Sequence, residues 1–180
     1  MKGLNNIMCA VDLDRYKMKN IDDLLKEYEI TNWDLILIGD GSGNMWDAPV
    51  GWSCILIDRN TDKKEKFVGG SSKGTIGMAE LMPYVVALNW YNETCRQDSS
   101  EHDVYIFTDS KSTADCGNKV SNRKKNCTMW QMIDWFESQG YCIQWIHINR
   151  NTCYEHGIAD QWASNGREFS KTLDEELEID

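Results

Sequence analysis

Four acidic residues of this 180-residue chain stand at the end of an apolar run or on the apolar side of a helical pattern: Asp40, Glu80, Asp109 and Asp160. A carboxylate in such a place is costly to remove from water unless it has a partner. One shared partner would account for all four. Hard oxygen ligands suit Mg²⁺ or Mn²⁺, and a pair of such ions about 4 Å apart is a common device for cutting phosphodiester bonds. The four acids therefore predict a site for divalent cations.

Each acid taken alone has a structural explanation. Asp40 could form a turn before a glycine, Asp109 could cap a helix, and Asp160 could belong to a solvated helix face. Glu80 is harder to explain in this way, because the helical pattern around it also carries Val85 on the same face. The structural explanations would have to hold for all four acids at once, which favours the shared metal site.

Apolar runs of strand length alternate along the chain with segments of helical periodicity. A turn at residues 58–62 separates the second strand from the third, so the first three strands are expected to form an antiparallel meander. Helices separate the later strands, and this order predicts an α/β fold with a mixed sheet flanked by helices. The strands are expected at residues 35–39, 52–58, 64–68, 104–107 and 142–148, and the helices at residues 21–29, 77–91, 110–116, 128–138 and 154–169.

Four short segments around the acids resemble type 1 ribonuclease H in their order and intervals, over roughly residues 33 to 168. They are G-D-G-S at residues 39–42, A-E-L-M at 79–82, T-D-S at 108–110 and A-D at 159–160. The resemblance implies a ribonuclease H-like fold, with a five-stranded mixed sheet that is antiparallel in its first three strands and flanked by helices. Residues 33–168 would form the catalytic domain, residues 1–32 an N-terminal extension with a short helix, and residues 169–180 an acidic C-terminal tail.

The resemblance also implies an activity. A type 1 ribonuclease H is a metal-dependent endoribonuclease that hydrolyses the RNA strand of an RNA/DNA hybrid and leaves 5′-phosphate and 3′-hydroxyl ends. By resemblance, Asp40 would bridge two Mg²⁺ ions, for which Mn²⁺ could substitute. Glu80 and Asp109 would hold the ion nearer the leaving 3′ oxygen, and Asp160 would hold the ion that activates the attacking water. These four carboxylates are the expected catalytic and metal-binding residues.

Substrate contacts are expected from residues close to the acids. Ser42 would lie beside the metals and could contact the RNA 2′-hydroxyl, and Thr75 matches a phosphate-contacting position of the family. Arg150 belongs to a His-x-x-Arg stretch similar to that of a family variant without a loop histidine, and could contact the scissile phosphate. His156 lies one helical turn before Asp160 and could reach the site. The full set of candidates is Gly41, Ser42, Gly43, Thr75, Lys111, Arg150 and His156.

The chain also departs from the family pattern. Residues 76–78 read Ile-Gly-Met where the family often has Asn, Lys111 stands where some members have Gln, and the mobile-loop histidine is missing. The missing Asn residues and the missing loop histidine favour an alternative: a nuclease of the same fold that acts on duplex or structured RNA or on DNA. A second alternative is a non-catalytic acidic binding module, which the net charge of −10 and the unmatched residues 1–32 motivate.

Composition limits the partners and the compartment. The acidic charge opposes a nucleic-acid partner, although residues 123–125 (Arg-Lys-Lys) and Lys63, Lys64 and Lys66 form local basic groups. A protein partner could use residues 1–32 or the acidic tail. Seven scattered cysteines without a Cys-x-x-Cys pair indicate buried or incidental thiols, and no stretch approaches the roughly 20 apolar residues of a membrane span. We therefore expect a cytoplasmic protein without membrane contact. We also expect His102 on the surface, and most of the cluster formed by Met129, Trp130, Met132, Ile133 and Trp135 in the core.

Overall fold

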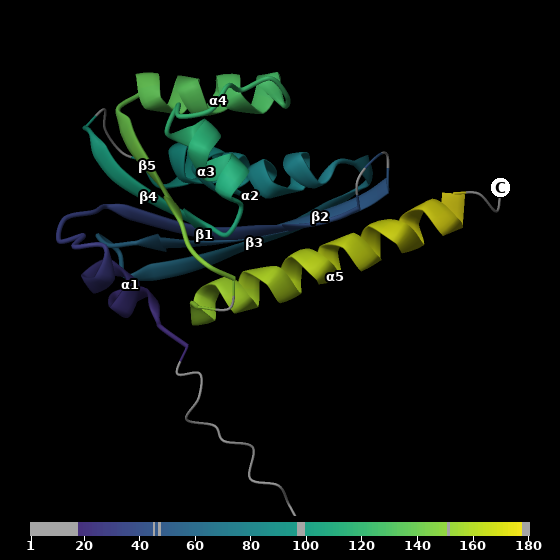
Figure 1. Cartoon of the computed structure of the whole chain (residues 1–180), viewed down its shortest axis with the longest axis horizontal. Coiled ribbons are helices and arrows are strands. Elements are labelled where there is room, and N and C mark those ends of the chain that lie inside the picture. Colours follow the sequence, from purple (N-terminus) through teal and green to yellow (C-terminus); the bar gives the residue numbers. More distant parts are fainter. Residues whose placement is uncertain (1–17, 45, 47, 97–99, 151, 178–180) are drawn as a thin grey trace, which may run out of the picture.

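The computed structural model describes residues 18–44, 46, 48–96, 100–150 and 152–177, with side chains up to Lys171. The predicted α/β fold with a five-stranded mixed sheet is confirmed (Figure 1). The elements in chain order are α1 (Ile21–Glu27), β1 (Leu35–Ser42), β2 (Ala48–Asp58), β3 (Lys63–Gly74), α2 (Ile76–Thr94), β4 (His102–Thr108), α3 (Lys111–Gly117), α4 (Cys127–Ser138), β5 (Tyr141–His147) and α5 (Tyr154–Leu177).

The sheet has the strand order β3-β2-β1-β4-β5. The pairs β1–β2 and β2–β3 are antiparallel, whereas β1–β4 and β4–β5 are parallel. The central strand β1 is fully buried at residues 35–38, because helices cover both faces of the sheet there. A central strand that is apolar on both faces is typical of parallel pairing with helical crossovers.

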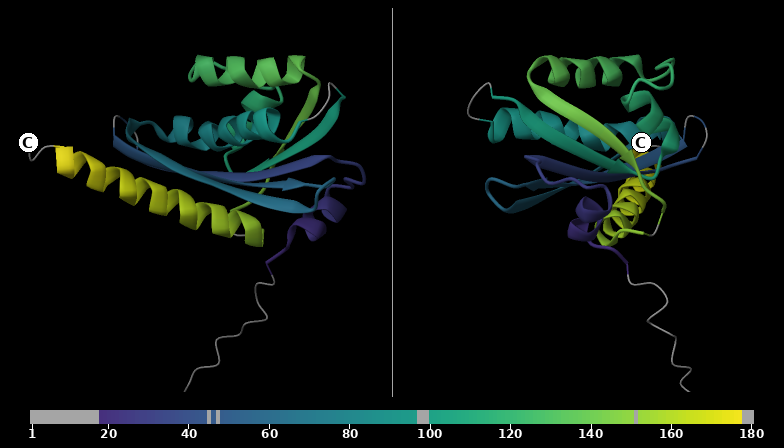
Figure 2. Two further views of the ribbon diagram at one scale, coloured as in Figure 1. Left: turned by 180° about the vertical axis from the view of Figure 1, so that it is seen from behind. Right: turned by 60° about the vertical axis from the view of Figure 1, so that its left-hand side comes forward.

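Helices α2, α3 and α4 lie on one face of the sheet, and α1 and α5 lie on the other, as the views in Figures 1 and 2 agree. Alternate side chains of β1 serve the two faces. Leu35 and Leu37 pack in the core under α2 and α4, and Ile36 and Ile38 pack in the core on the side of α1. Asp40 continues the even-numbered series toward the face that α5 covers.

Helix α1 is part of the second core, as the apolar spacing of residues 21–29 predicts. Its N-cap Asn20 accepts a hydrogen bond from the Asp23 amide while the Asp23 side chain accepts one from the Asn20 amide, which closes a capping box. Its buried face carries Ile21, Leu24 and Leu25, which join the core cluster of Ile36 and Ile38. This helix therefore packs on the main domain.

Several elements extend beyond their predicted ends, and β3 and α5 do so furthest. Strand β3 was expected to stop at Val68 but continues to Gly74, because Gly69 and Gly70 still pair with β2 and Gly74 pairs with Ala48 after a register shift. At Gly70 the missing Cβ leaves room for α5. Helix α5 was expected to stop at Phe169 but continues to Leu177, since no proline or glycine follows Gly166 to interrupt it. The first part of the predicted acidic tail is therefore helical.

The prediction that His102 lies on the surface is wrong. Its side chain is buried at the start of β4 and stacks on the Tyr141 ring, with the ring centroids 5.5 Å apart. Of the cluster expected in the core, Trp130 and Ile133 are buried and Met129 is partly buried, whereas Met132 and Trp135 are exposed. None of the helices in the described part of the chain has both the length and the apolar character that crossing a membrane requires.

Candidate active site

Strands β1 and β4 place two of the four acids side by side. The parallel register pairs Ile38 with Phe107, so Asp40 and Asp109 each lie two residues beyond the last paired position. Asp40 is buried within β1, and Asp109 follows β4 directly with a side chain that is 14% exposed. One ligand atom each from Asp40, Asp109 and His156 lie within 4.8 Å of one another. Parallel strand ends thus bring two carboxylates and an imidazole together.

Helix α2 brings Glu80 to the same end of the sheet. Thr75 caps this helix, because its hydroxyl accepts a hydrogen bond from the Met78 amide. A Cβ on Gly41 would lie 2.5 Å from the Ala79 carbonyl carbon and the Glu80 nitrogen, so only glycine allows α2 to approach β1 this closely. The close contact places Glu80 beside Asp40, the residue before Gly41 in β1.

Helix α5 supplies the fourth acid and is fixed to β2 beside Asp40. Ser53 of β2 pairs with Asp40 across the antiparallel ladder, and its hydroxyl donates a 2.7 Å hydrogen bond to the Ala159 carbonyl. Asp160 follows Ala159 directly. Its Oδ1 accepts a hydrogen bond from Arg150 Nη2 at 2.5 Å, and Arg150 Nε lies 3.9 Å from Asp109 Oδ2. The loop between β5 and α5 therefore ties Asp160 to Asp109 through one guanidinium.

Tyr84 of α2 links this helix to strands β1 and β4 next to the acids. It lies one helical turn after Glu80, and its buried hydroxyl donates a 2.8 Å hydrogen bond to the Gly39 carbonyl. The Phe107 carbonyl is a second possible acceptor at 3.2 Å. The two carbonyls precede Asp40 by one residue and Asp109 by two. The sequence analysis did not single out Tyr84, although its spacing from Glu80 was an available signal.

The acids perturb one another because they are buried together. Burial, followed by the charge of Asp109, raises the pKa of Asp40 to about 7. Burial, followed by the charges of Asp40 and Asp109, raises the pKa of Glu80 to about 9. Burial alone would raise the pKa of Asp109 as well, but His156 and Arg150 outweigh it and the pKa is lowered. Strongly perturbed carboxyls gathered at one place are typical of functional sites.

The donor set suits divalent cations. Asp40 Oδ2 and Glu80 Oε2 are buried, and neither has a hydrogen-bond partner among the described residues. Leaving such atoms unpaired costs about 1–3 kcal/mol each, and more when the group is charged. A hard cation bound by carboxylate oxygens would satisfy both atoms and would neutralise the repulsion that raises their pKa values.

The other residues predicted to contact the substrate lie near the end of β1, at the starts of α2 and α3, and before and within the first turn of α5. Ser42 ends β1, and Gly43 follows it against Val50, where a Cβ would come within 2.8 Å of Cγ1. Thr75 stands at the N-terminus of α2, as described above. Lys111 begins α3, but its amine pairs with Asp115 Oδ2 at 2.5 Å rather than with the four acids. Arg150 and His156 are the two candidates whose side chains touch the acids, and the Gly41 amide donates a 2.8 Å hydrogen bond to Asp40 Oδ1.

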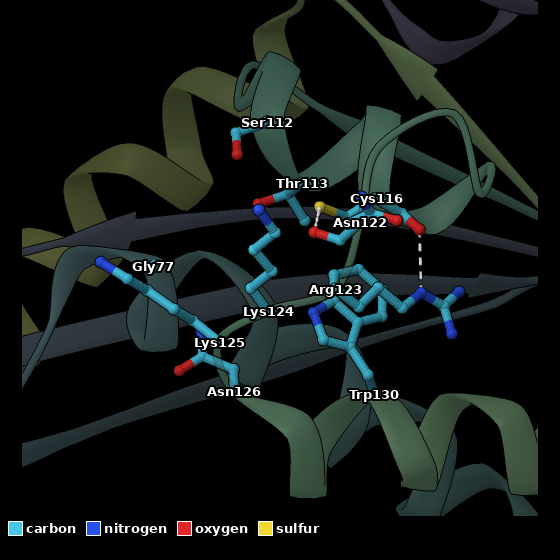
Figure 3. Close-up of a pocket in the computed structure, with 10 residues that line it drawn as sticks. All are labelled: Gly77, Ser112, Thr113, Cys116, Asn122, Arg123, Lys124, Lys125, Asn126 and Trp130. Atoms are coloured by element: carbon cyan, nitrogen blue, oxygen red, sulfur yellow. Dashed lines mark hydrogen bonds between the residues drawn. The ribbon is translucent and has the colours of Figure 1, made fainter.

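A basic pocket of about 360 Å³ lies between the start of α2, helix α3 and the start of α4 (Figure 3). Lys124 and Lys125 line it together with Asn126, and Figure 3 shows the Lys124 side chain extending toward Thr113. Arg123 is used structurally: it pairs with an acid of α4, donates to two carbonyls of α3 and covers the Trp130 ring at 4.3 Å. The sequence showed the basic run at residues 123–125, but it did not predict that Arg123 would be held by contacts within the protein while Lys124 and Lys125 line the pocket.

Comparisons with known proteins agree with the geometry. No protein-family model matches the chain. The ribonuclease H of Alcanivorax borkumensis is 30% identical over 147 residues, which cover 74% of this chain and 91% of that protein.

Solved structures share the fold. The N-terminal RNase H domain of Rv2228c from Mycobacterium tuberculosis has a TM-score of 0.62 at 14% identity, covering 79% of this chain and 99% of that one. LC11-RNase H1, solved in complex with an RNA/DNA hybrid, has a TM-score of 0.60 at 15% identity, with 76% and 98% covered. The RNase H1 of the halophilic archaeon Halobacterium salinarum has a TM-score of 0.55 at 15% identity, with 74% and 97% covered. The chain therefore belongs to the ribonuclease H family of nucleic-acid hydrolases and is a type 1 ribonuclease H-like protein.

Proposed function

We propose that this protein is a metal-dependent endoribonuclease that hydrolyses the RNA strand of RNA/DNA hybrids and leaves 5′-phosphate and 3′-hydroxyl ends. The observation that carries the proposal is the meeting of Asp40 and Asp109 with Glu80 and Asp160 at one end of the sheet, from four separate elements. The LC11-RNase H1 structure, which holds an RNA/DNA hybrid, supports this substrate by analogy of fold.

Asp40, Glu80, Asp109 and Asp160 would hold two divalent cations, Mg²⁺ or Mn²⁺. When bound, such ions lower the pKa of the attacking water and stabilise the charge that develops on the leaving oxygen. The protein's part is to aim the carboxylates at one place, and the bound cations would favour the ionised forms of Asp40 and Glu80, whose pKa values the metal-free fold raises. Arg150 pairs with Asp160 and lies near Asp109, and its exposed guanidinium would contact the scissile phosphate.

The basic pocket supplies a second contact region for the substrate. Lys124 and Lys125 contribute positive charge beside the N-termini of α2 and α4, and this charge is local in a chain of net charge −10. Of the three basic residues that line this pocket, Arg123 is held by contacts within the protein, which leaves Lys124 and Lys125 to contact the substrate. Hybrid binding should therefore be weak and sensitive to salt.

A second candidate substrate is duplex or structured RNA. The Ile76-Gly77-Met78 stretch, which stands where the family often has Asn, forms the first turn of α2, and the described loop before α5 carries Arg150 in place of a histidine. These residues lie where selection between hybrid and duplex RNA would be expected. The cytoplasmic location and a protein partner for residues 1–32 or the C-terminal tail remain predictions.

One cleavage experiment separates the substrates. Purified protein with Mg²⁺ or Mn²⁺ is incubated with labelled hybrid, duplex RNA, duplex DNA and single strands, and the ends are identified by their need for phosphatase or kinase before ligation. We expect internal cleavage of the RNA strand of the hybrid, and loss of this activity in Asp109→Asn with unchanged circular dichroism. Preferential cleavage of duplex RNA would favour the second candidate. Cleavage of none by folded protein with bound metal would contradict both.

A further inference from the structure

Resting on the metal-dependent function above, we propose that His156 Nε2 is a direct ligand of the cation held by Asp40 and Asp109, and that this nitrogen makes the site select Mn²⁺ over Mg²⁺. The four carboxylates alone would form an all-oxygen site. The imidazole adds a donor of a different chemical class, with consequences for which ion is bound.

The position of His156 is suited to ligation. It lies four residues before Asp160 on α5, so both side chains project from the same face of the helix. Its Nε2 lies 3.5 Å from Asp109 Oδ1, and the Asp40 carboxylate is within 4.8 Å of both. Two donors bound at right angles to one ion with bonds of about 2.1 Å lie about 3 Å apart. A small inward movement of the three side chains would therefore seat one cation between them.

The contact with Asp109 does not satisfy the histidine. The side chain is 1% exposed, and neither ring nitrogen has a hydrogen-bond partner among the residues that the structure describes. At 3.5 Å, the contact with Asp109 is longer than a charge-assisted hydrogen bond, which is about 2.7–2.9 Å. Asp40 Oδ2 is a second unpaired atom in the same group of three side chains. A shared cation would give both Asp40 Oδ2 and the ring nitrogen a partner.

The chemistry of the donors points to the ion. Carboxylates suit Mg²⁺, Ca²⁺ and Mn²⁺, whereas imidazole suits transition metals. Mn²⁺ is the ion that accepts a set dominated by carboxylates and still gains from a nitrogen ligand. Mg²⁺ prefers oxygen and keeps its waters, so it gains little from His156.

A purely structural role predicts a different spectrum. If His156 only positions Asp109, its nitrogen stays outside the coordination sphere of the metal. Electron spin echo envelope modulation on the full-length protein loaded with Mn²⁺ separates these cases, because directly bound imidazole gives ¹⁴N coupling. His156→Asn removes the imidazole and retains a polar side chain of smaller size. His147→Asn is the matched control, since His147 Nε2 lies 3.2 Å from the Asp109 backbone oxygen and is not one of the three clustered side chains.

We expect ¹⁴N coupling in the wild type and in His147→Asn, and its loss in His156→Asn. Titration calorimetry should show Mn²⁺ affinity falling by about tenfold or more in His156→Asn, with a much smaller change for Mg²⁺. Absence of ¹⁴N coupling in the Mn²⁺-loaded wild type, or equal losses for both ions, would overturn the proposal even if the hybrid is cleaved. If His156→Asn does not fold, the wild-type spectrum decides alone. Failure of the wild type to bind any divalent cation would instead overturn the proposed function and this ligand with it.

Discussion

Replacing Asp40 by Asn should stabilise the metal-free protein at pH 8, although it removes a residue that we place in the active site. The side chain is 2% exposed, and its Oδ2 has no hydrogen-bond partner among the described residues. Its Oδ1 accepts a 2.8 Å hydrogen bond from the Gly41 amide, which an Asn oxygen can also accept. The substitution therefore removes a buried charge and retains the contact.

The magnitude follows from the pKa. Burial and neighbouring charges raise the pKa of Asp40 from 3.8 to about 7, which corresponds to about 4 kcal/mol of unfavourable free energy once the group is ionised in the fold. Between about pH 4 and pH 7 the unfolded chain has lost this proton while the folded chain retains it, so rising pH favours unfolding by about 1.4 kcal/mol per pH unit. The penalty is absent below this window and complete above it.

Urea unfolding in EDTA, followed by far-ultraviolet circular dichroism at pH 5, 6, 7 and 8, measures this effect. The free energy of unfolding of Asp40→Asn minus that of the wild type should rise by about 3 kcal/mol from pH 5 to pH 8. The control is Asp58→Asn, a buried acid whose oxygens accept hydrogen bonds from the Asn60 amide and the Thr61 hydroxyl. This variant should be less stable than the wild type at pH 8. A difference for Asp40→Asn that stays constant across the pH range would refute the reasoning.

Three further changes test other parts of the site. Arg150→Met should raise Mg²⁺ affinity about two- to fivefold by calorimetry, because the guanidinium competes with the cation for a carboxylate of α5; unchanged affinity would contradict this competition. Gly41→Ala should lower the free energy of unfolding by about 1–3 kcal/mol, since its Cβ would collide with the backbone of α2, while Gly77→Ala, with 3.4 Å to its nearest neighbour, should be tolerated. Lys124→Ala combined with Lys125→Ala should weaken hybrid binding and flatten its salt dependence, and an unaltered salt slope would exclude the pocket from substrate contact.

The sequence predicted the features that depend on local pattern. Apolar runs located all five strands, and helical spacing located the start of α1 near residue 21. The position of His156 near Asp160 followed from helical spacing alone. The pairing of Asp40 with Asp109 required the strand order, which the resemblance to type 1 ribonuclease H implied and the parallel pairing of β1 with β4 provides.

Features that depend on contacts between distant residues could not be predicted. His102 looked exposed because it lies among acidic and polar residues, yet stacking on Tyr141, 39 positions later, buries it. The ion pair between Arg150 and Asp160 depends on the path of the loop before α5, which no periodicity describes. The length of β3 depends on its pairing with β2, which outweighs the low strand propensity of its glycines.

Because the acids repel one another, the rest of the fold has to keep them from moving apart. Carboxylates that raise one another's pKa would move apart if their backbones were free to yield, and a cation would then find no preformed site. The Tyr84 hydroxyl opposes this movement, because its hydrogen bond to the Gly39 carbonyl and its proximity to the Phe107 carbonyl bind α2 to the two strand ends that carry Asp40 and Asp109. The ring is completely buried, so water cannot replace this contact. The acids therefore stay fixed in position although their ionised forms are unfavourable in the metal-free fold. A cation bound between them would relieve this repulsion and so stabilise the folded protein.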